Sequence, residues 1–212
     1  MFPRIKNIIY KFLTIHNILP SHKKKFKSGD YYYYNGIRPT FEKSLPLINS
    51  SGRALDIGAG FGNETKTLLK MGFEVVATEI NFKATRYLEK LAKRSDSSRR
   101  ALEVYNMQLP DIPKGKFDLI VCEMVLHFMS KNEVLASIQN IQSSTSNRGL
   151  NVISSYIDSK SIHQDVRLAG YFSYLLKSGE LQKLYSDWDI LYAEEKSNML
   201  GHQSVRLITR KK

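Results

Sequence analysis

Short apolar runs alternate with helical patterns along the centre of the sequence, and this alternation constrains the fold more than any other feature. The apolar runs occupy residues 54–57, 74–79, 101–105, 117–122 and 150–156. Helical patterns separate them at residues 63–71, 82–94 and 131–143. Strands that alternate with helices form a parallel sheet with helices on both faces. The sequence therefore predicts a doubly wound α/β domain.

The C-terminal part has a different pattern. Two strand-like runs, residues 189–193 and 204–209, follow each other with only a short connection. Consecutive strands joined in this way pair antiparallel. We therefore expect an antiparallel hairpin at the edge of the sheet. A further helix is expected near the start of the domain, from Thr40 to Ile48, because a turn sequence follows it.

The positive charge of the chain is concentrated at its N-terminus. The 212 residues carry a net charge of +12, and residues 1–29 hold seven Lys and Arg residues with no acid. Apolar residues follow helical spacing from Phe2 to about Leu19. We predict a basic amphipathic arm at 1–29 and one domain at 30–212. The arm could pack on its own domain, lie on an anionic membrane surface, dock on nucleic acid, or direct the chain to an organelle.

The cysteine and histidine residues argue against a disulfide-bonded or metal-binding protein. Cys122 is the single cysteine, which excludes an intramolecular disulfide and a multi-thiolate metal site. The five histidines are scattered, and His163 and Asp165 form no larger cluster, so no metal is expected. The sequence contains no apolar run of about 18 residues, the length that a spanning helix needs. We expect a cytoplasmic protein, either free or peripheral to a membrane.

A glycine-rich turn follows the first apolar run. It reads Gly58-Ala59-Gly60-Phe61-Gly62 and leads into the first helical pattern. In an open α/β sheet, ligands bind beyond the carboxyl ends of the strands, at the point where the strand order reverses. Glycines there let the backbone approach a ligand closely. Gly58, Ala59 and Gly60 are therefore predicted to bind a nucleotide-type ligand.

Two carboxylates indicate which nucleotide it is. Glu79 stands at the end of the second strand, 21 residues after Gly58, where a carboxylate can accept hydrogen bonds from both ribose hydroxyls. Asp56 precedes the turn and would repel a pyrophosphate, whereas it suits a cationic ligand. Asn63 also stands where the dinucleotide pattern has Gly or Ala. The pattern favours S-adenosyl-L-methionine, which carries an ammonium and a sulfonium, over NAD as the alternative.

Longer segments resemble a known family. "LDIGAGFG" and "VVATEIN" resemble the cofactor loop and acidic strand end of class I S-adenosylmethionine-dependent methyltransferases. "GDYYYYNGIRPTFEKSL", "FDLIVCEMVLHFM" and "FSYLLKSGELQKLYSDWDIL" are similar to segments of the tellurite-resistance (TehB-like) methyltransferase family. The resemblance covers about Lys27 to Lys212. It implies a Rossmann-like class I methyltransferase fold of three α/β/α layers, with a seven-stranded, mostly parallel sheet whose last strand is antiparallel.

The resemblance also implies a set of cofactor contacts. S-adenosyl-L-methionine would be the cofactor and S-adenosyl-L-homocysteine the product. Contacts carry over to Asp56, Gly58, Gly60 and Glu79. Asn106 stands where such enzymes commonly use Asp to hold the adenine amino group, and Met107 beside it offers a backbone N–H. We also expect Arg38 to reach the methionine carboxylate and Cys122 to lie near the cofactor or to pack as a small apolar residue.

Methyl transfer needs little acid–base apparatus, because an enzyme mainly has to hold the nucleophile in line with the sulfonium carbon. The candidates for a catalytic role are Tyr34, from the run Tyr31–Tyr34, together with His127 and His202. Each could instead be a packing residue. Glu123, directly after the fourth strand, could receive a substrate amine, orient a nucleophile, or be a solvated carboxylate.

The residues favour an enzyme that methylates a small-molecule acceptor, with a thiol or a metalloid oxyanion suggested by analogy with the family. The chain lacks the His–Arg pair that tellurite-type members carry before the last strand. One alternative is an RNA or protein methyltransferase anchored by the basic arm. Another is a non-catalytic module that keeps the fold and binds a membrane or a partner. The sequence gives no indication of the oligomeric state.

Overall fold

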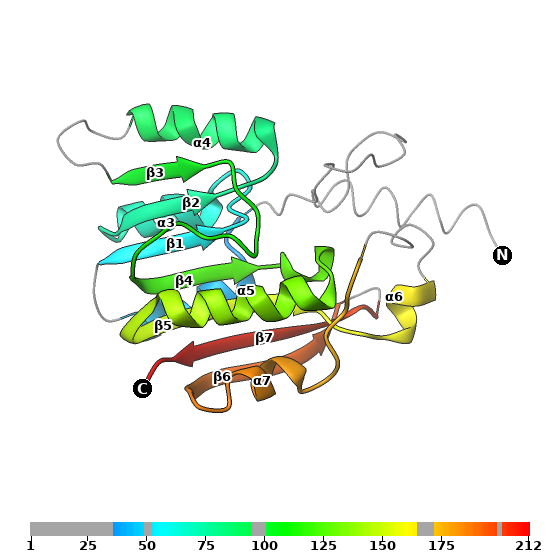
Figure 1. The fold of residues 1–212 in the computed structure, drawn as a ribbon. Coiled ribbons are helices and arrows are strands. Elements are labelled where there is room, and N and C mark those ends of the chain that lie inside the picture. The colour runs from blue at the N-terminus through cyan, green and yellow to red at the C-terminus, as the bar shows by residue number, and fades with distance from the viewer. Residues whose placement is uncertain (1–35, 49–51, 95–100, 165–171, 199–200) are drawn as a thin grey trace.

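The computed structural model describes residues 36–48, 52–94, 101–164, 172–198 and 201–212 (Figure 1). The predicted arm at 1–29, the tyrosine run with Tyr34, and Asp165 lie outside the described residues.

Seven strands form a single sheet in the order β3-β2-β1-β4-β5-β7-β6 (Figure 1). All neighbouring strands from β3 to β5 pair in parallel, whereas β7 is antiparallel to both β5 and β6. The predicted α/β class, the seven strands and the antiparallel last strand are confirmed. The strands are β1 (Arg53–Ile57), β2 (Glu74–Thr78), β3 (Leu102–Tyr105), β4 (Phe117–Glu123), β5 (Thr145–Tyr156), β6 (Asp189–Ser197) and β7 (Gln203–Arg210).

The C-terminal hairpin is also present, and its order in the sheet is specific. β7 lies between β5 and β6, so β6 is the edge strand. β5 begins at Thr145, five residues before the apolar run that predicted it. The early part of β5 contains Arg148 at φ 64°, and the pairing with β4 shifts between Phe117 and Leu119. The apolar pattern therefore located only the regular, fully buried part of this strand.

Helices cover both faces of the sheet (Figure 1). The helical elements are α2 (Pro39–Ser44), η1 (Leu45–Leu47), α3 (Asn63–Lys70), α4 (Phe82–Arg94), η2 (Leu126–Phe128), α5 (Lys131–Ser144), α6 (Lys160–Gln164) and α7 (Glu180–Leu184). α5 begins at a capping box, in which Ser130 and Glu133 each bind the other's backbone N–H. The short helices α6 and α7 were not predicted, because five residues carry too little periodicity to stand out from a loop.

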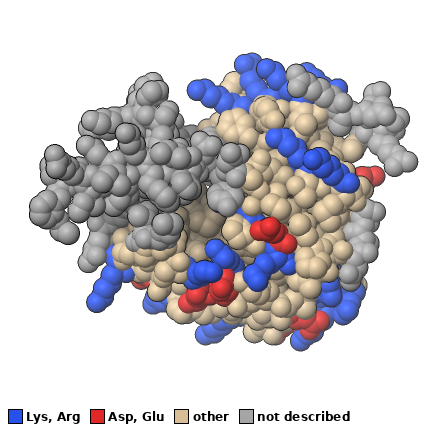
Figure 2. All heavy atoms as spheres, turned by 180° about the vertical axis from the view of Figure 1, so that it is seen from behind, with Lys and Arg blue, Asp and Glu red and all other residues tan. Residues whose placement is uncertain are grey.

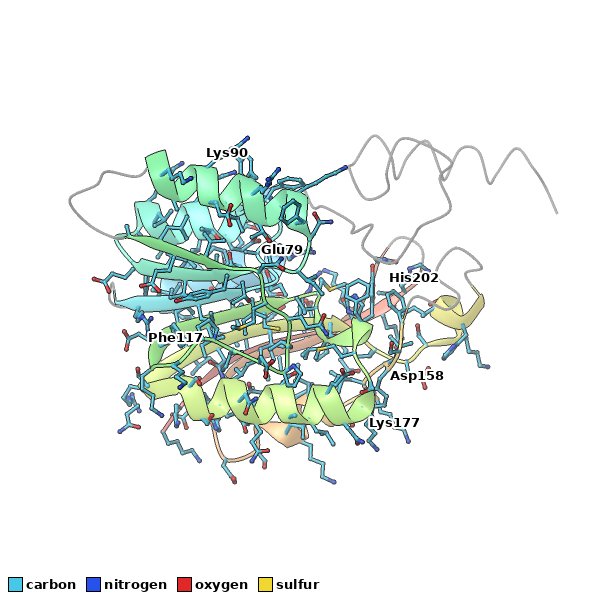
Figure 3. All side chains as sticks on the ribbon, turned by 45° about the horizontal axis from the view of Figure 1, so that its top comes forward. Glu79, Lys90, Phe117, Asp158, Lys177 and His202 are labelled. Atoms are coloured by element: carbon cyan, nitrogen blue, oxygen red, sulfur yellow. The ribbon has the colours of Figure 1, made fainter. Side chains whose placement is uncertain are left out.

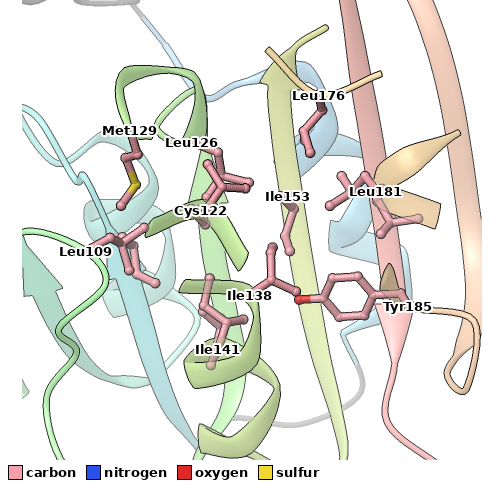
Figure 4. Close-up of a cluster of buried hydrophobic side chains, with 14 of the residues drawn as sticks. Leu109, Cys122, Leu126, Met129, Ile138, Ile141, Ile153, Leu176, Leu181 and Tyr185 are labelled. Carbon is pink, nitrogen blue, oxygen red and sulfur yellow. The ribbon is translucent and has the colours of Figure 1, made fainter. Parts of the chain in front are cut away.

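One core lies between the sheet and helices α5 and α7. Ile138 and Ile141 of α5 pack with Cys122, Ile153 and Tyr185 (Figure 4). Tyr185 is fully buried, and its hydroxyl accepts a hydrogen bond from the Asn151 side chain at 3.2 Å. The burial of these side chains fixes α5 on this face of β4 and β5.

A second core lies on the other face, under α2, α3 and α4. Phe41, Leu68 and Leu88 come from the three helices and pack with apolar residues of the strands. The outer face of α4 is strongly basic, and Lys and Arg gather in Figure 2 at the end of the molecule where α4 lies. Its exposed basic side chains are Lys83, Arg86, Lys90 and Lys93.

Phe41→Ala tests how far α2 depends on this core. The side chain is fully buried, and α2 has only six residues, so packing must hold it in place. We expect the free energy of unfolding to fall by about 3 to 5 kcal/mol, the usual cost of removing a buried phenyl group. Phe82→Ala is the matched control, because Phe82 is 63% exposed and its loss should cost no more than about 0.5 kcal/mol. Urea denaturation of both variants measures the difference, and equal losses would contradict this account of α2.

Candidate functional site

The candidate site lies where the strand order reverses. β1 pairs with β2 on one side and with β4 on the other, so the connections that leave β1 and β4 run to opposite sides. Ile57, at the end of β1, lies level with Thr78 of β2 and Cys122 of β4. The residues that come next along the chain therefore lie side by side at the carboxyl edge. They are Gly58 after β1, Glu79 after β2 and Glu123 at the end of β4. Glu79 and His202 both lie toward this edge, and Phe117 lies at the opposite one (Figure 3).

The turn after β1 needs its glycines. Gly58, Gly60 and Gly62 have φ values of 67°, 55° and 72°, in the left-handed region that favours glycine. A Cβ on Gly58 would stand 2.5 Å from Cγ2 of Val125, in the turn after β4. A Cβ on Gly62 would stand 2.6 Å from Cδ2 of Leu88 on α4. The two loops beside the switch point thus touch through a position that only glycine can fill.

Glu79 joins the loops that follow β1 and β2. Its carboxylate accepts a hydrogen bond from the Gly60 N–H at 2.8 Å and another from the Asn81 N–H at 2.6 Å. Burial raises the pKa of Glu79, and these backbone hydrogen bonds oppose the rise. Asn81 also accepts from the N–H groups of Lys83 and Ala84, and so caps the start of α4. The Glu79 carboxylate, which is predicted to bind the ribose, is therefore held in a fixed position.

Asn106 lies beside this loop. Its side-chain NH₂ donates to the carbonyl groups of Glu79 and Ile80 at 2.9 and 3.1 Å and to the Thr85 hydroxyl at 3.2 Å. These bonds hold the end of β2 against β3, and they leave the amide oxygen as the acceptor of this side chain. Met107 follows and is half-buried.

Asp56 belongs to a group of three buried carboxylates on the α2 and α3 side of the sheet. It is 3% exposed and accepts a hydrogen bond from the Thr65 hydroxyl of α3 at 2.6 Å. Burial, together with the charges of Glu64 and Glu123, raises the pKa of Asp56 to about 7, although the hydrogen bond from Thr65 favours the ionised form. Glu64 was not predicted from the sequence, because it stands in the first turn of α3, where an acid is ordinarily a solvated helix-start residue.

Glu123, at the end of β4, faces the same group. It is 5% exposed, and neither carboxylate oxygen accepts a hydrogen bond of ordinary geometry from a described residue. Burial raises the pKa of Glu123 to about 7. The Thr40 hydroxyl, the positive charge on Arg38 and the Ser154 hydroxyl oppose that rise, whereas the charge of Glu64 adds to it.

Arg38 stands directly before α2, at the rim of this group. Its backbone N–H donates to the Glu64 carboxylate at 2.7 Å, which ties the start of α2 to α3. The positive charge on its side chain acts on both Glu123 and His127. Arg38 therefore places one positive charge beside the buried carboxylates, and its expected contact with the methionine carboxylate stays a prediction.

His127 is buried in an aromatic cluster on the other side of Glu123. Its Nδ1 lies 3.2 Å from the Ser155 hydroxyl and accepts a long hydrogen bond of 3.5 Å from the Tyr156 N–H. An Nδ1 that accepts leaves the proton of a neutral imidazole on Nε2. Burial, together with the positive charge on Arg38, lowers the pKa of His127 to about 3. The ring packs on Phe128, Tyr156 and Phe172, with centroids 4.3, 5.0 and 4.8 Å away.

His202 and Cys122 each pack in a different part of the fold. His202 is 4% exposed and presents its ring edge to Tyr156 at 6.1 Å, because the start of the antiparallel β7 lies at the carboxyl edge of the parallel strands. Cys122 is fully buried in the α5 core, on the opposite face of β4 from Glu123 (Figure 4). Burial raises the pKa of the Cys122 thiol, so it is an apolar packing group.

The structure also contains a pocket away from the candidate site. A pocket lined by Phe73, Asp118 and Arg210 lies at the amino ends of the strands, on the edge where open α/β sheets do not bind their ligands.

His163 pairs with Asp158 at 2.6 Å on the surface. Across the described ranges, no group of three or more His, Cys, Asp or Glu side chains could hold a metal ion. The helices within these ranges are all too short or too polar to cross a membrane.

The chain matches a family model and several curated proteins. A family model described as "Tellurite resistance protein TehB" matches residues 25–205. A curated relative from Haemophilus influenzae (strain 10810), described as "Probable S-adenosyl-L-methionine-dependent methyltransferase TehB", is 26% identical over 148 residues. That match covers 70% of this chain and 50% of the relative, so the chain spans about half the length of the curated protein.

Solved structures show the same fold. The crystal structure of TehB from Haemophilus influenzae matches with a TM-score of 0.67 and 22% identity, over 83% of this chain and 63% of that one. The 1,6-didemethyltoxoflavin-N1-methyltransferase of Burkholderia thailandensis, solved with its substrate and S-adenosylhomocysteine, matches with a TM-score of 0.67 and 17% identity. It covers 82% of this chain and 77% of that chain. The chain has the Rossmann-like class I methyltransferase fold and belongs to the tellurite resistance protein TehB family.

Proposed function

We propose that this chain binds S-adenosyl-L-methionine at the carboxyl edge of the sheet and transfers its methyl group to a small-molecule acceptor. The observation that carries the proposal is the arrangement of Glu79 and the glycine turn. The carboxylate and the turn face each other across a 2.8 Å hydrogen bond, at the reversal of strand order. Family membership and the names of the relatives support the same activity.

The proposed cofactor contacts follow from this arrangement. Each oxygen of the Glu79 carboxylate already accepts one backbone N–H and keeps further acceptor capacity for a ribose hydroxyl. In the turn Gly58-Ala59-Gly60, the two glycines have no side chain, so the cofactor can approach the backbone closely there. Asp56 supplies negative charge for the ammonium of the cofactor, and Arg38 supplies positive charge for its carboxylate.

The adenine end would lie toward β3. The Asn106 amide oxygen is the group that can accept a hydrogen bond from the adenine amino group, because its NH₂ is already engaged. The Met107 backbone N–H would donate to the ring. Cys122 contributes only to the packing beneath the site.

When bound, the cofactor supplies an electrophilic methyl group on a positively charged sulfur. The part of this chain is to hold the acceptor in line and to exclude water. His127 is neutral and carries its proton on Nε2, so it serves as a hydrogen-bond donor that positions the acceptor rather than as a base. His202 and Tyr34 remain proposed contributors, His202 through the aromatic cluster and Tyr34 as a cover.

Calorimetric titration with S-adenosyl-L-methionine tests the role of Glu79. Glu79→Ala should weaken binding by about 1.5 to 3 kcal/mol, because it removes charge-assisted hydrogen bonds. Glu74→Ala is the matched control, since Glu74 is an exposed glutamate at the other end of the same strand. A folded Glu79→Ala chain that binds as tightly as the control would remove the assignment. Failure of the unmodified chain to bind S-adenosyl-L-methionine, with NAD bound instead, would overturn the proposed function.

A double-mutant cycle tests the contact between the two loops. Gly58→Ala should reduce the affinity for S-adenosyl-L-methionine about tenfold or more, because the new methyl group collides with Val125. Val125→Ala in the same chain removes the collision and should restore part of the affinity, while the strain of a left-handed alanine remains. The same titration measures all four chains. Identical affinities for the single and the double variant would show that the contact with Val125 is irrelevant.

A further inference from the structure

Glu123 stands out among the buried polar groups of the described residues. Its two carboxylate oxygens are inaccessible to solvent, and neither accepts a hydrogen bond of ordinary geometry from the described part of the chain. The Thr40 and Ser154 hydroxyls lie close enough only to lower its pKa in part. A buried carboxylate without a donor is costly, and native proteins rarely keep one without a reason. By contrast, the neighbouring acids have partners, since Asp56 accepts from Thr65 and Glu64 accepts from the Arg38 N–H. Glu123 therefore has unfilled acceptor capacity, and Arg38 and Glu64 are charged groups near it.

The position of Glu123 assigns it to the acceptor rather than to the nucleotide. It follows Cys122, which lies level with Ile57, so Glu123 is beside Gly58 across the reversal of strand order. Glu79, which would hold the ribose, lies on the far side of β1. The aromatic cluster of His127 begins four residues after Glu123. Glu123 thus lies at the end of β4, next to the proposed cofactor turn on one side, and the turn that follows it carries His127 of the aromatic cluster.

The charges around Glu123 indicate what it can bind. Asp56 from β1 and Glu64 from α3 are negative when ionised, and Arg38 before α2 is positive. Two carboxylates and one guanidinium surround a third carboxylate, so a cationic group is favoured there and an anion is disfavoured.

We propose that the methyl acceptor is an amine and that Glu123 binds its ammonium nitrogen. This inference rests on the proposed function, because it names the acceptor class of the same site. The chemistry also gives Glu123 a second role. The ammonium of the acceptor gives one proton to the carboxylate, and its nitrogen lone pair becomes available. The nitrogen–carbon bond then forms while the carbon–sulfur bond breaks, and sulfur keeps the electron pair as a thioether. The methylated product is an ammonium ion, and the proton on Glu123 returns to water.

The first experiment asks whether the ammonium could be that of the cofactor. S-adenosyl-L-methionine and S-adenosyl-L-homocysteine, which both carry an amino group, are titrated into the unmodified chain, Glu123→Gln and Glu74→Gln. We expect all three chains to bind both compounds within about threefold of one another. A tenfold loss confined to Glu123→Gln would assign Glu123 to the cofactor and overturn the proposal. If the unmodified chain bound neither compound, the proposed function itself would fail.

The second experiment tests the acceptor class directly. The chain saturated with S-adenosyl-L-homocysteine is titrated with a panel of primary amines that includes 2-phenylethylamine and 1,4-diaminobutane, and with 2-phenylethanethiol and tellurite. At least one amine should bind, with a tenfold or greater loss in Glu123→Gln and none in Glu74→Gln. The same amine should accept radiolabelled methyl groups, and Glu123→Gln should slow that transfer at least a hundredfold. The proposal is wrong if no amine prefers the unmodified chain to Glu123→Gln, or if only the thiol or tellurite binds.

Thermal unfolding checks that Glu123→Gln folds and that the carboxylate is buried. The pKa of Glu123 is raised to about 7 in the folded chain, so the folded state keeps a proton that the unfolded state releases above the ordinary value of 4.5. The unmodified chain therefore loses stability as the pH rises through this window, and the loss is complete above about pH 7. Glu123→Gln should have the higher melting temperature at pH 8, and the difference should shrink toward pH 5. In Glu123→Gln the charge of Glu123 no longer raises the pKa of Asp56, so Asp56 ionises more easily in the folded state, which adds to the gain in stability at pH 8. An equal difference at both pH values would contradict the burial of an ionisable group.

Discussion

The two hydrogen bonds that the Glu79 carboxylate accepts hold together the part of the molecule on which the site depends. Gly60 donates from the turn after β1 and Asn81 donates from the turn after β2, so one side chain fixes both loops. Asn81 in turn caps α4, and Asn106 ties the carbonyl of Glu79 to the end of β3. The three strands on this side of the sheet thus end in a single hydrogen-bonded unit. A ligand that replaces or shares these bonds meets a site that is already ordered, which lowers the entropy cost of binding.

The sequence predicted the parts of this arrangement that repeat a regular pattern. Apolar runs located the buried strands closely, because both faces of a parallel sheet exclude polar residues. The same reasoning missed the start of β5, where Arg148 interrupts the apolar pattern, and the five-residue helices α6 and α7. Glycine spacing located the turn after β1, because the left-handed backbone there can hardly use another residue.

Contacts between distant segments could not be predicted in the same way. Nothing in the local sequence distinguishes Glu64 from an ordinary solvated acid at a helix start, yet it is buried against the backbone of Arg38, 26 residues away. Likewise, the tautomer of His127 depends on the Tyr156 N–H of a neighbouring strand. Sequence reasoning placed Asp56, Glu79 and Glu123 at the correct edge of the sheet, but burial and partners, which only the fold supplies, separate their roles.

The candidate site is rich in acidic groups, whereas the whole chain is positively charged. The chain carries a net charge of +12, while three carboxylates are buried together beside one arginine. Such a site holds its negative charge at a cost, because a rise in the pKa of Glu123 from 4.5 to about 7 corresponds to about 3 kcal/mol of folding free energy at neutral pH. That is a substantial part of the 5 to 15 kcal/mol by which domains are ordinarily stable. Replacing Glu123 by a neutral residue would be an easy way to stabilise this chain, so the carboxylate conflicts with stability at a position next to the glycine turn. Conflicts of this kind are expected where a side chain serves a ligand, because a cation brought to the site satisfies the carboxylate in a way that the folded chain alone does not.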